Sequence, residues 1–238
     1  MPQLPPLDPA VLDQLKSVST ATLASQLRKK GVRNVFIAGA KPLTRGRRLV
    51  GEAYTLRFIP MREDLSRTEI LSDLAYPPRK AIEDIPAGQV LVVDCRGDRR
   101  AGVLGDILAL RLALRGAAGV VADGPMRDAG QLAEMELPIF CAGGAAPATL
   151  SVHFGADLQC PIACGGVAVL PGDIMAGDED GVVVVPRTMA ADVARDAAEQ
   201  EELEVFLKEQ IAAGKPTAGV YPANAETLAA FETWRRQR

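Results

Sequence analysis

Histidine, cysteine and aromatic residues are scarce in this chain of 238 residues, which has one histidine and four cysteines. A single histidine, His153, disfavours a Ser-His-Asp or Cys-His mechanism, and we expect it to be an ordinary packing or capping residue. The cysteines at positions 95, 141, 160 and 164 are expected to be buried thiols rather than a disulfide framework. Cys160 and Cys164 have no second cysteine pair or histidine cluster to complete a zinc site, so we reject zinc.

Long apolar runs are also absent, and the amino terminus lacks the basic start and apolar stretch of a signal peptide. We therefore expect a cytoplasmic protein that does not act at a membrane. The chain carries 27 basic and 30 acidic residues, a formal charge of -3, which supplies no field for a polyphosphate backbone. Nucleic acid is not expected as a ligand.

The composition, 48% hydrophobic with 22 glycines, favours an α/β protein with an aliphatic core. Residues 1–213 are expected to form one domain, and residues 214–238 a linker and a terminal helix that packs on this domain or on a neighbouring subunit. Apolar spacing predicts helices over 9–18, 19–30, 63–74, 189–213 and 223–238, and strands over 50–59, 137–141, 166–170 and 180–186. The prolines at 77 and 78 are expected to end the helix over 63–74.

One βαβ unit stands out between residues 89 and 123. Residues 89–94 and 119–123 have the composition of buried strands, and residues 105–116 that of a helix. A right-handed crossover makes the two strands parallel, so the loops that follow them emerge at the same edge of the sheet. Ligands bind at this edge in open α/β sheets.

Four features meet at that edge on this topology. The amides of Gly105, Asp106, Ile107 and Leu108 have no intrahelical partners and lie at the positive end of the helix dipole. Asp106 opens the helix, and the pair Arg127 and Asp128 follows the second strand closely. The predicted helix, turn and strand bring this pair back within reach of Asp106.

These groups suit a 2-oxo acid and a divalent cation. Arg127 can bind a carboxylate through two parallel hydrogen bonds, and Asp106 and Asp128 offer the hard oxygen ligands that Mg²⁺ or Mn²⁺ prefers. Breaking the C3–C4 bond of such an acid leaves a pyruvate enolate whose charge the cation and Arg127 can stabilise. Aldol cleavage and decarboxylation share this intermediate.

A purely structural interpretation is also open. Asp106 would then be a first-turn acid that favours the helix dipole, Asp128 the cap of the next helix, and Arg127 its salt-bridge partner. The seven lysines lie in polar settings, so a covalent amine mechanism is not favoured.

Several segments together resemble the RraA-like family, which contains 4-hydroxy-4-methyl-2-oxoglutarate aldolases and regulators of RNase E. The most specific of them is the spacing from Asp106 to Arg127 and Asp128. The others are residues 19–24, 51–55, 105–108, 119–124 and 167–186, the last with Pro-Gly-Asp at 171–173 and Asp-Gly-Val at 180–182.

The resemblance implies a swivelling β/β/α domain, like that of phosphohistidine domains, with N-terminal helices and a C-terminal helical extension. It also implies homotrimers or hexamers with a metal-dependent pyruvate aldolase site between subunits, and oxaloacetate decarboxylation. By this resemblance Arg127 binds substrate, Asp128 anchors the metal, and Asp106 holds metal-bound water and acts as a base. The amides of residues 105–108 would hold the pyruvoyl carboxylate.

In the regulators of the family the residue after the arginine is generally not Asp, so Asp128 favours an enzyme. The aldolases commonly have Asn where Ile107 stands and an acid where Gln131 stands, which leaves the exact substrate open. A glutamate from a neighbouring subunit completes the family's metal shell, and Glu199, Glu201 and Glu202 are candidates. The alternatives are a regulatory binding protein that inhibits a ribonuclease, and a sugar-acid lyase or hydratase that uses the same metal-enolate chemistry.

Overall fold

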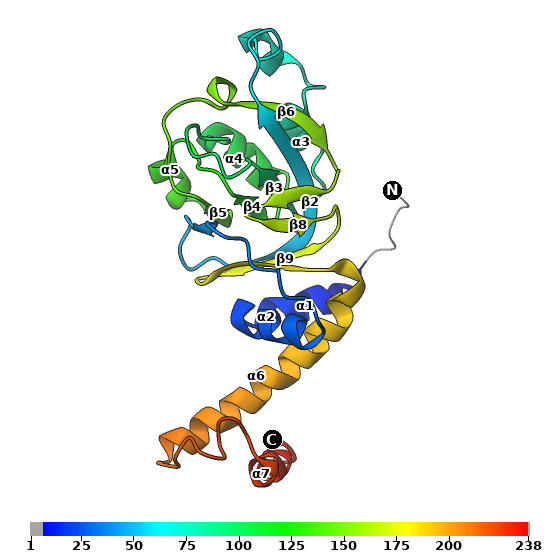
Figure 1. Ribbon diagram of the computed structural model, residues 1–238, viewed down its shortest axis with the longest axis vertical. Helices are drawn as coiled ribbons and strands as arrows, with labels where there is room; N and C mark the ends of the chain where they lie inside the picture. Colours follow the sequence, from blue (N-terminus) through cyan, green and yellow to red (C-terminus); the bar gives the residue numbers. More distant parts are fainter. Residues whose placement is uncertain (1–6, 238) are drawn as a thin grey trace.

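The computed structural model describes residues 7–237 and contains a mixed sheet of eight strands (Figure 1). Its path runs β1-β5-β4-β3-β2-β9-β10, and β6 pairs with β2 off this path. These strands are β1 (Lys41–Pro42), β2 (Leu49–Pro60), β3 (Gln89–Asp94), β4 (Gly119–Ala122), β5 (Ile139–Cys141), β6 (His153–Leu158), β9 (Ile174–Asp178) and β10 (Gly181–Val185). The four central strands, β2 to β5, are parallel, and the flanking pairs are antiparallel.

The predicted βαβ unit is present. β3 and β4 are parallel neighbours, with Val90 opposite Gly119 and Val93 opposite Ala122, and α4 (Asp106–Leu114) connects them. The strands lie between packed layers, which explains their uninterrupted Val and Leu runs.

Helices cover one face of the parallel strands and a hairpin covers the other. α3 (Pro77–Asp84), α4 and α5 (Ala129–Ala133) pack on the first face, where Leu91, Leu112 and Val120 are buried together. On the second face, the hairpin of β7 (Ile162–Cys164) and β8 (Val167–Val169) joins a cluster that includes Val92 and Phe140. Alternate side chains of each strand therefore enter two separate cores.

The N-terminal helices pack with the long C-terminal helix beside β9 and β10. α1 (Pro9–Ser17), α2 (Thr20–Lys29) and α6 (Ala190–Ala212) bury Leu15, Leu23 and Val193 in one cluster with Val183 of β10. The Asp8 carboxylate accepts a hydrogen bond from the Ala10 amide and so caps the start of α1.

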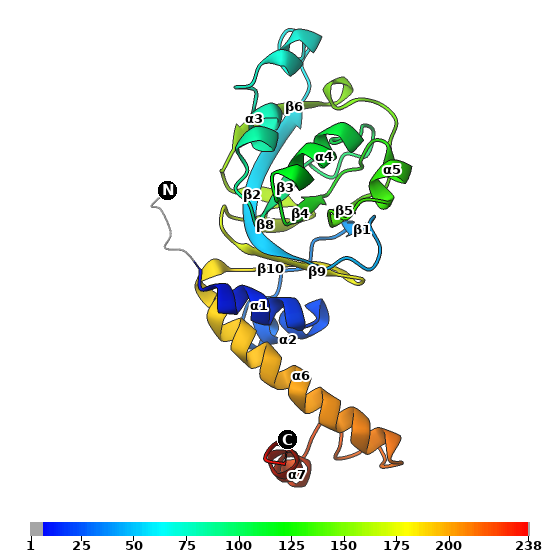
Figure 2. The same ribbon diagram turned by 180° about the vertical axis from the view of Figure 1, so that it is seen from behind.

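α6 continues past this layer, away from the sheet, and carries α7 (Ala225–Arg235) at its far end (Figure 2). Phe206 of α6 packs there against Phe231 and Trp234 of α7, with ring centroids 5.8 and 5.6 Å away. The expected terminal helix therefore exists, and within this chain it packs on the end of α6. The predicted linker over 214–222 connects the two helices, and Arg238 lies outside the described residues.

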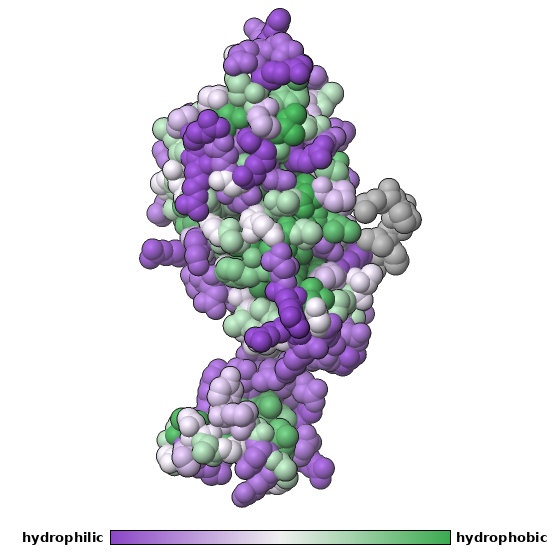
Figure 3. Space-filling model, in the orientation of Figure 1, coloured by the Kyte–Doolittle hydropathy of each residue, from purple (hydrophilic) through white to green (hydrophobic). Residues whose placement is uncertain are grey.

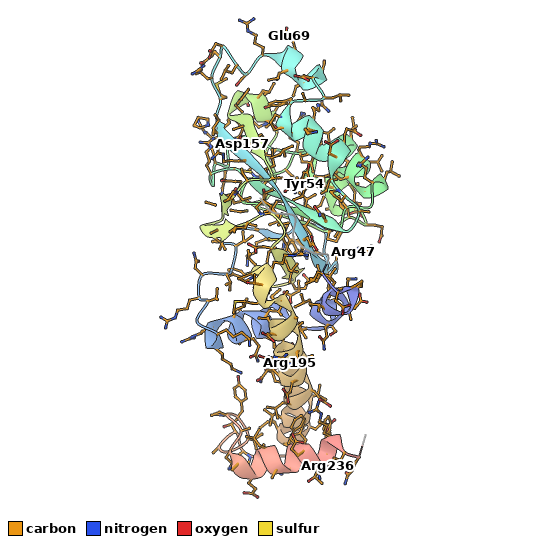
Figure 4. All side chains as sticks on the ribbon, turned by 90° about the vertical axis from the view of Figure 1, so that its right-hand side faces the viewer. Arg47, Tyr54, Glu69, Asp157, Arg195 and Arg236 are labelled. Atoms are coloured by element: carbon orange, nitrogen blue, oxygen red, sulfur yellow. The ribbon has the colours of Figure 1, made fainter. Side chains whose placement is uncertain are left out.

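The predicted helix over 63–74 is wrong. Only a short 3₁₀ helix, η1 (Thr68–Ser72), forms there, and none of its residues is buried. The segment forms a polar tip of the molecule (Figure 3). Glu69 lies in this tip, at the end of the molecule that is farthest from α7 and Arg236 (Figure 4). Its apolar residues Leu65 and Leu74 stay 40% and 70% exposed, so a helix would gain no tertiary packing there.

Pro77 and Pro78 begin α3 rather than ending a helix. They stand at its first positions, where no intrahelical amide bond is lost. The sequence pattern predicted none of α5, β1, β6, β7, β9, η2 (Thr149–Ser151) and η3 (Arg187–Met189). No helix within residues 7–237 has the length and apolar character needed to cross a bilayer.

Candidate active site

The segment that follows β4 runs beside the loop that precedes α4. The Arg127 amide donates to the Leu104 carbonyl over 2.8 Å, and the Val103 amide donates to the Pro125 carbonyl over 3.0 Å. A Cβ added at Gly102 would lie 2.6 Å from the Arg127 amide nitrogen, so only glycine permits this approach. The backbone thus fixes Arg127 next to the start of α4.

Asp128 lies at the same place with an unusual backbone. Its φ and ψ of 55° and 39° are in the left-handed region, which costs energy for residues other than glycine and recurs at functional sites. Its carboxylate faces Gly105, because a Cβ added at Gly105 would lie 2.8 Å from Oδ2 of Asp128. The carboxylate therefore lies at the amino-terminal end of α4.

Asp106 is the first residue of α4 and directly follows Gly105, the N-cap. Its Oδ1 accepts a hydrogen bond of 2.7 Å from the Ile107 amide. This contact fits a first-turn acid, and it leaves Oδ2 and the second lone pair of Oδ1 for another ligand. Asp106 and Asp128 thus flank one glycine at a helix terminus.

The interpretation of Asp128 as a helix cap and Arg127 as its salt-bridge partner does not agree with the contacts in the structure. Asp128 stands at the N-cap of α5 but makes no side-chain capping bond. Within the described residues, Arg127 forms no side-chain hydrogen bond or ion pair, and Asp106 and Asp128 form no ion pair. The charges at this edge are available to a ligand.

A cavity of about 290 Å³ opens beside these residues. Of the predicted site residues, Arg127, Gly105 and Leu108 line this cavity. The others do not line it: Asp106, Ile107 and Asp128. Its other polar lining residues were not predicted from the sequence; they are Thr68, Tyr76, Arg79 and Thr149. Its volume is at the small end of the range of about 300–1,000 Å³ that is usual for small-molecule sites.

A larger cavity of about 790 Å³ lies elsewhere, beside the ends of β2, β8 and β10. Its charged groups satisfy one another: the Arg187 guanidinium is 2.6 Å from the Glu52 carboxylate. Burial raises the pKa of Asp173, whose carboxylate accepts from the amides of Leu170 and Arg187. The smaller cavity, beside which the charged side chains have no ion-pair partner among residues 7–237, is therefore the candidate site.

Two buried carboxylates at the ends of β3 and β4 hold the neighbouring loops. Asp123 accepts hydrogen bonds from the amides of Cys95, Gly97 and Gly165 over 2.6, 2.9 and 3.2 Å. Asp94 accepts from Arg96 and Ala163, and burial raises its pKa despite these bonds. The sequence could have indicated these two carboxylates, because Asp94 is the last residue of β3 and Asp123 directly follows β4.

The three candidate glutamates of α6 all have partners within the chain. Glu201 accepts from the amide and hydroxyl of Ser19 over 2.9 and 2.8 Å, which ties α6 to α2. Arg235 of α7 lies 3.7 Å from Glu199 and 3.0 Å from Glu202. A role for any of them at a neighbouring subunit's metal stays a prediction, and it would compete with these contacts.

The remaining expectations concern His153 and the cysteines. His153 is fully buried, packs on the Phe58 ring with centroids 5.3 Å apart, and does not line the cavity, in agreement with a packing role. All four cysteines are free thiols; Cys160 is half-buried and the other three are buried.

Comparison with known proteins places this geometry in a family. Residues 19–184 match the RraA-like family model, described as Aldolase/RraA. The chain belongs to the RraA-like family. It is 30% identical over 190 residues to a protein of Halalkalibacterium halodurans named as a candidate 4-hydroxy-4-methyl-2-oxoglutarate aldolase, with 80% of this chain and 83% of that protein covered.

Two further RraA-like relatives differ in length and in name. Protein DlpA of Legionella pneumophila is 28% identical over 206 residues, which are 87% of this chain but only 32% of DlpA. The crystal structure of Streptomyces coelicolor RraAS2, a member of the RNase ES inhibitor family, superposes with a TM-score of 0.76 at 35% identity. It covers 87% of this chain and 99% of that one, which confirms the RraA-like α/β fold.

Proposed function

We propose that this RraA-like protein is a divalent-metal-dependent lyase that releases pyruvate from a 4-hydroxy- or 4-carboxy-2-oxo acid. The observation that carries the proposal is the meeting of Arg127, Asp128 and the start of α4 beside a cavity. Neither Arg127 nor Asp128 forms an ion pair with any residue from 7 to 237. The aldolase name of the Halalkalibacterium relative supports the same reaction class.

The donors present fit a hard divalent cation. Asp128 and Asp106 supply carboxylate oxygens on either side of Gly105. Residues 7–237 contain no group of three or more metal-ligating side chains, so these two carboxylates would be the only ligands from the described part of this chain. Two carboxylates suit Mg²⁺ or Mn²⁺, which retains several waters in such sites. When bound, the cation would supply Lewis acidity toward the 2-oxo group.

The residues of the chain would do the rest. Arg127 and the amides of Gly105, Asp106 and Leu108 bind and orient the carboxylate at C1 and offset the negative charge that grows on the enolate. The fourth predicted amide, that of Ile107, is occupied by Oδ1 of Asp106. Asp106 accepts the proton of the 4-hydroxyl through a water when an aldol substrate is cleaved. Leu104 and Leu108 line the cavity and would place apolar walls beside the carbon chain of the substrate.

A coupled assay for pyruvate tests the proposal. The purified chain is given oxaloacetate or 4-hydroxy-4-methyl-2-oxoglutarate, with EDTA and then with added Mg²⁺ or Mn²⁺. We expect pyruvate release that EDTA abolishes and the metals restore. If neither substrate yields pyruvate in the presence of metal, the proposal that the protein is a lyase is wrong.

The second candidate is a regulatory protein that binds and inhibits a ribonuclease. Its support is the likeness to Streptomyces RraAS2. This function requires no metal, so inhibition of an RNase E-type enzyme that persists in EDTA, by a chain that releases no pyruvate, would favour it.

We also propose that the active form is a homotrimer or hexamer. α4 exposes Ile107, Leu110 and Leu114 at 77%, 53% and 74%, an apolar stripe next to the site. Sedimentation equilibrium should give three or six times the chain mass, and Leu110→Lys should lower that value. A monomeric wild-type protein would contradict the proposal.

A further inference from the structure

The candidate cavity contains a second guanidinium that the proposed chemistry does not use. Arg79, in the first turn of α3, lines the same cavity as Arg127. Among residues 7–237 its lining includes two positive side chains and no aspartate or glutamate. Asp106 and Asp128 lie beside the cavity rather than in its wall, and a cation bound there would offset their negative charge. Such a wall favours an anion with two negative groups.

Arg79 is half-buried and has no partner of its own. It makes no side-chain hydrogen bond or ion pair with any residue between 7 and 237. The next residue, Lys80, forms an ion pair with Asp84 along the exposed side of the same helix. The contrast between these two neighbours indicates that the Arg79 guanidinium is reserved for a ligand.

The base of Arg79 is rigid. The Tyr76 hydroxyl accepts a hydrogen bond of 2.9 Å from the Gly155 amide, and the Tyr76 ring packs on Phe154. Pro78 packs so tightly on Gly155 that an added Cβ would lie 2.3 Å from the proline ring. Because the start of α3 is held in this way, the backbone that carries Arg79 is fixed, and binding has to order only the Arg79 side chain itself.

The walls between the two arginines are aliphatic. Leu71, Val103, Leu104, Leu108 and Leu150 line the cavity together with them. Such walls suit a short carbon chain, and the two guanidiniums of the lining supply one positive group for each of two carboxylates. The cavity therefore suits a dicarboxylate rather than a monocarboxylate.

We propose that Arg79 binds the distal carboxylate of a dicarboxylic 2-oxo acid and so selects the substrate. This inference rests on the proposed function, in which Arg127 and the α4 amides hold the carboxylate at C1. Arg79 is thus a specificity-determining residue for a substrate whose second carboxylate lies beyond C4.

The position of that carboxylate favours aldol cleavage over decarboxylation. In aldol cleavage the 4-hydroxyl loses its proton, the C3–C4 pair moves to C3, and C4 becomes a carbonyl while the distal carboxylate keeps its charge. In oxaloacetate the C3–C4 pair also moves to C3, but the carboxylate itself leaves as neutral CO₂. An arginine on that group stabilises the reactant more than the transition state.

Binding of inert analogues tests the inference without catalysis. 2-Oxoglutarate and 2-oxopentanoate have the same chain length, differ in the distal carboxylate, and lack the 4-hydroxyl that cleavage requires. Calorimetry on the full chain with saturating Mg²⁺ should show a preference for 2-oxoglutarate. Arg79→Ala should lower the affinity for 2-oxoglutarate by about 10- to 100-fold, as expected for loss of a charged hydrogen-bond donor. The affinity for 2-oxopentanoate should not change.

Two variants serve as controls. Arg79→Lys keeps the charge without the two-pronged geometry and should recover part of the preference. Lys80→Ala removes the neighbouring positive charge and should bind both analogues as the wild type does. Equal weakening of both analogues by Arg79→Ala, or an unchanged preference, would overturn the inference.

Kinetics separate this inference from the proposed function. Arg79→Ala should raise KM for 4-hydroxy-2-oxoglutarate, leave 4-hydroxy-2-oxopentanoate unaffected, and leave kcat for oxaloacetate unchanged or higher. If the wild type binds 2-oxoglutarate through Arg79 but releases no pyruvate, the lyase fails and the dicarboxylate site stands. If it releases pyruvate and Arg79→Ala keeps the wild-type substrate preference, the reverse holds.

Discussion

Oδ2 of Asp128 lies 2.8 Å from the point that a Cβ on Gly105 would occupy. Gly105 is the N-cap of α4, where serine, threonine, asparagine or aspartate would usually stabilise the helix more. The missing side chain leaves room for the carboxylate of another segment at the positive end of the helix. The glycine thus trades helix stability for the position of Asp128.

Gly105→Ala is predicted to disable the site and leave the fold intact. The added methyl group must displace the Asp128 carboxylate, and a misplacement of about 1 Å at a catalytic site can cost about 100-fold in rate. Pyruvate release and Mn²⁺ affinity by titration calorimetry should both fall. Gly130→Ala in α5 is the matched control, because no atom lies within 4 Å of its added Cβ. Wild-type Mn²⁺ affinity in Gly105→Ala would contradict the role of Asp128.

Arg127→Ala is predicted to lower kcat for pyruvate release by about 100- to 1,000-fold, the usual loss for one donor to a developing oxyanion. Arg127→Lys should recover only part of the rate, because a lysine lacks the paired donors. Unfolding midpoints should stay near that of the wild type, since the Arg127 side chain has no bonded partner among residues 7–237. Arg28→Ala on α2, an exposed arginine far from the site, is the control. Unchanged pyruvate release in Arg127→Ala would remove it from the mechanism.

The βαβ unit and the meeting of Arg127 with the start of α4 followed from sequence because local signals and topology agreed there. Buried runs such as residues 89–94 have one stable placement, between two layers, and the handedness of the crossover then fixes which loops are neighbours. The left-handed backbone of Asp128 left no comparable signal, since aspartate is also common as an ordinary cap.

Arg79 could not be placed from sequence because Pro77 and Pro78 have two opposite meanings. Prolines end a helix from inside and begin one at its first turn, and the apolar spacing before them favoured the wrong choice. Tertiary packing of Tyr76 and Pro78 on β6, a strand that the sequence analysis missed, decided the matter. The wall of the cavity that α3 forms was missed with it.

His153 is predicted to make stability depend on pH below neutrality. Burial, followed by the nearby Arg96 guanidinium, lowers its pKa in the folded state below the usual value of about 6.5. The unfolded chain therefore takes up a proton first, so the stabilisation is complete above pH 6.5 and is lost as the pH falls toward the folded pKa. The loss can reach about 1.4 kcal/mol per pH unit.

Urea unfolding at pH 7.5, 6.5 and 5.5 measures this effect. His153→Gln removes the only histidine, so its free energy of unfolding should fall less than that of the wild type between these values. Parallel curves for the two proteins would show that His153 does not carry the dependence.

The far end of α6 and the helix α7, here called the α6–α7 arm, are predicted to unfold before the sheet. Its cluster has four buried side chains, Phe206, Leu207, Val220 and Phe231, and the main packing partner of α7 is α6. Regions with few buried contacts open at a lower free energy than the core. Trp234, the only tryptophan, packs on Phe206 and reports on this region directly.

In a urea titration, the midpoint of tryptophan fluorescence should therefore lie below the midpoint of circular dichroism. Phe206→Ala, which removes the ring at the centre of the cluster, should shift the emission to the red without urea and leave the main dichroism transition in place. Tyr221→Ala is the aromatic control, since its side chain is 66% exposed and lies on the same arm. Coincident midpoints for the two signals would mean that the arm and the sheet unfold as one unit, which in an oligomer would place the arm against a neighbouring chain rather than in solvent.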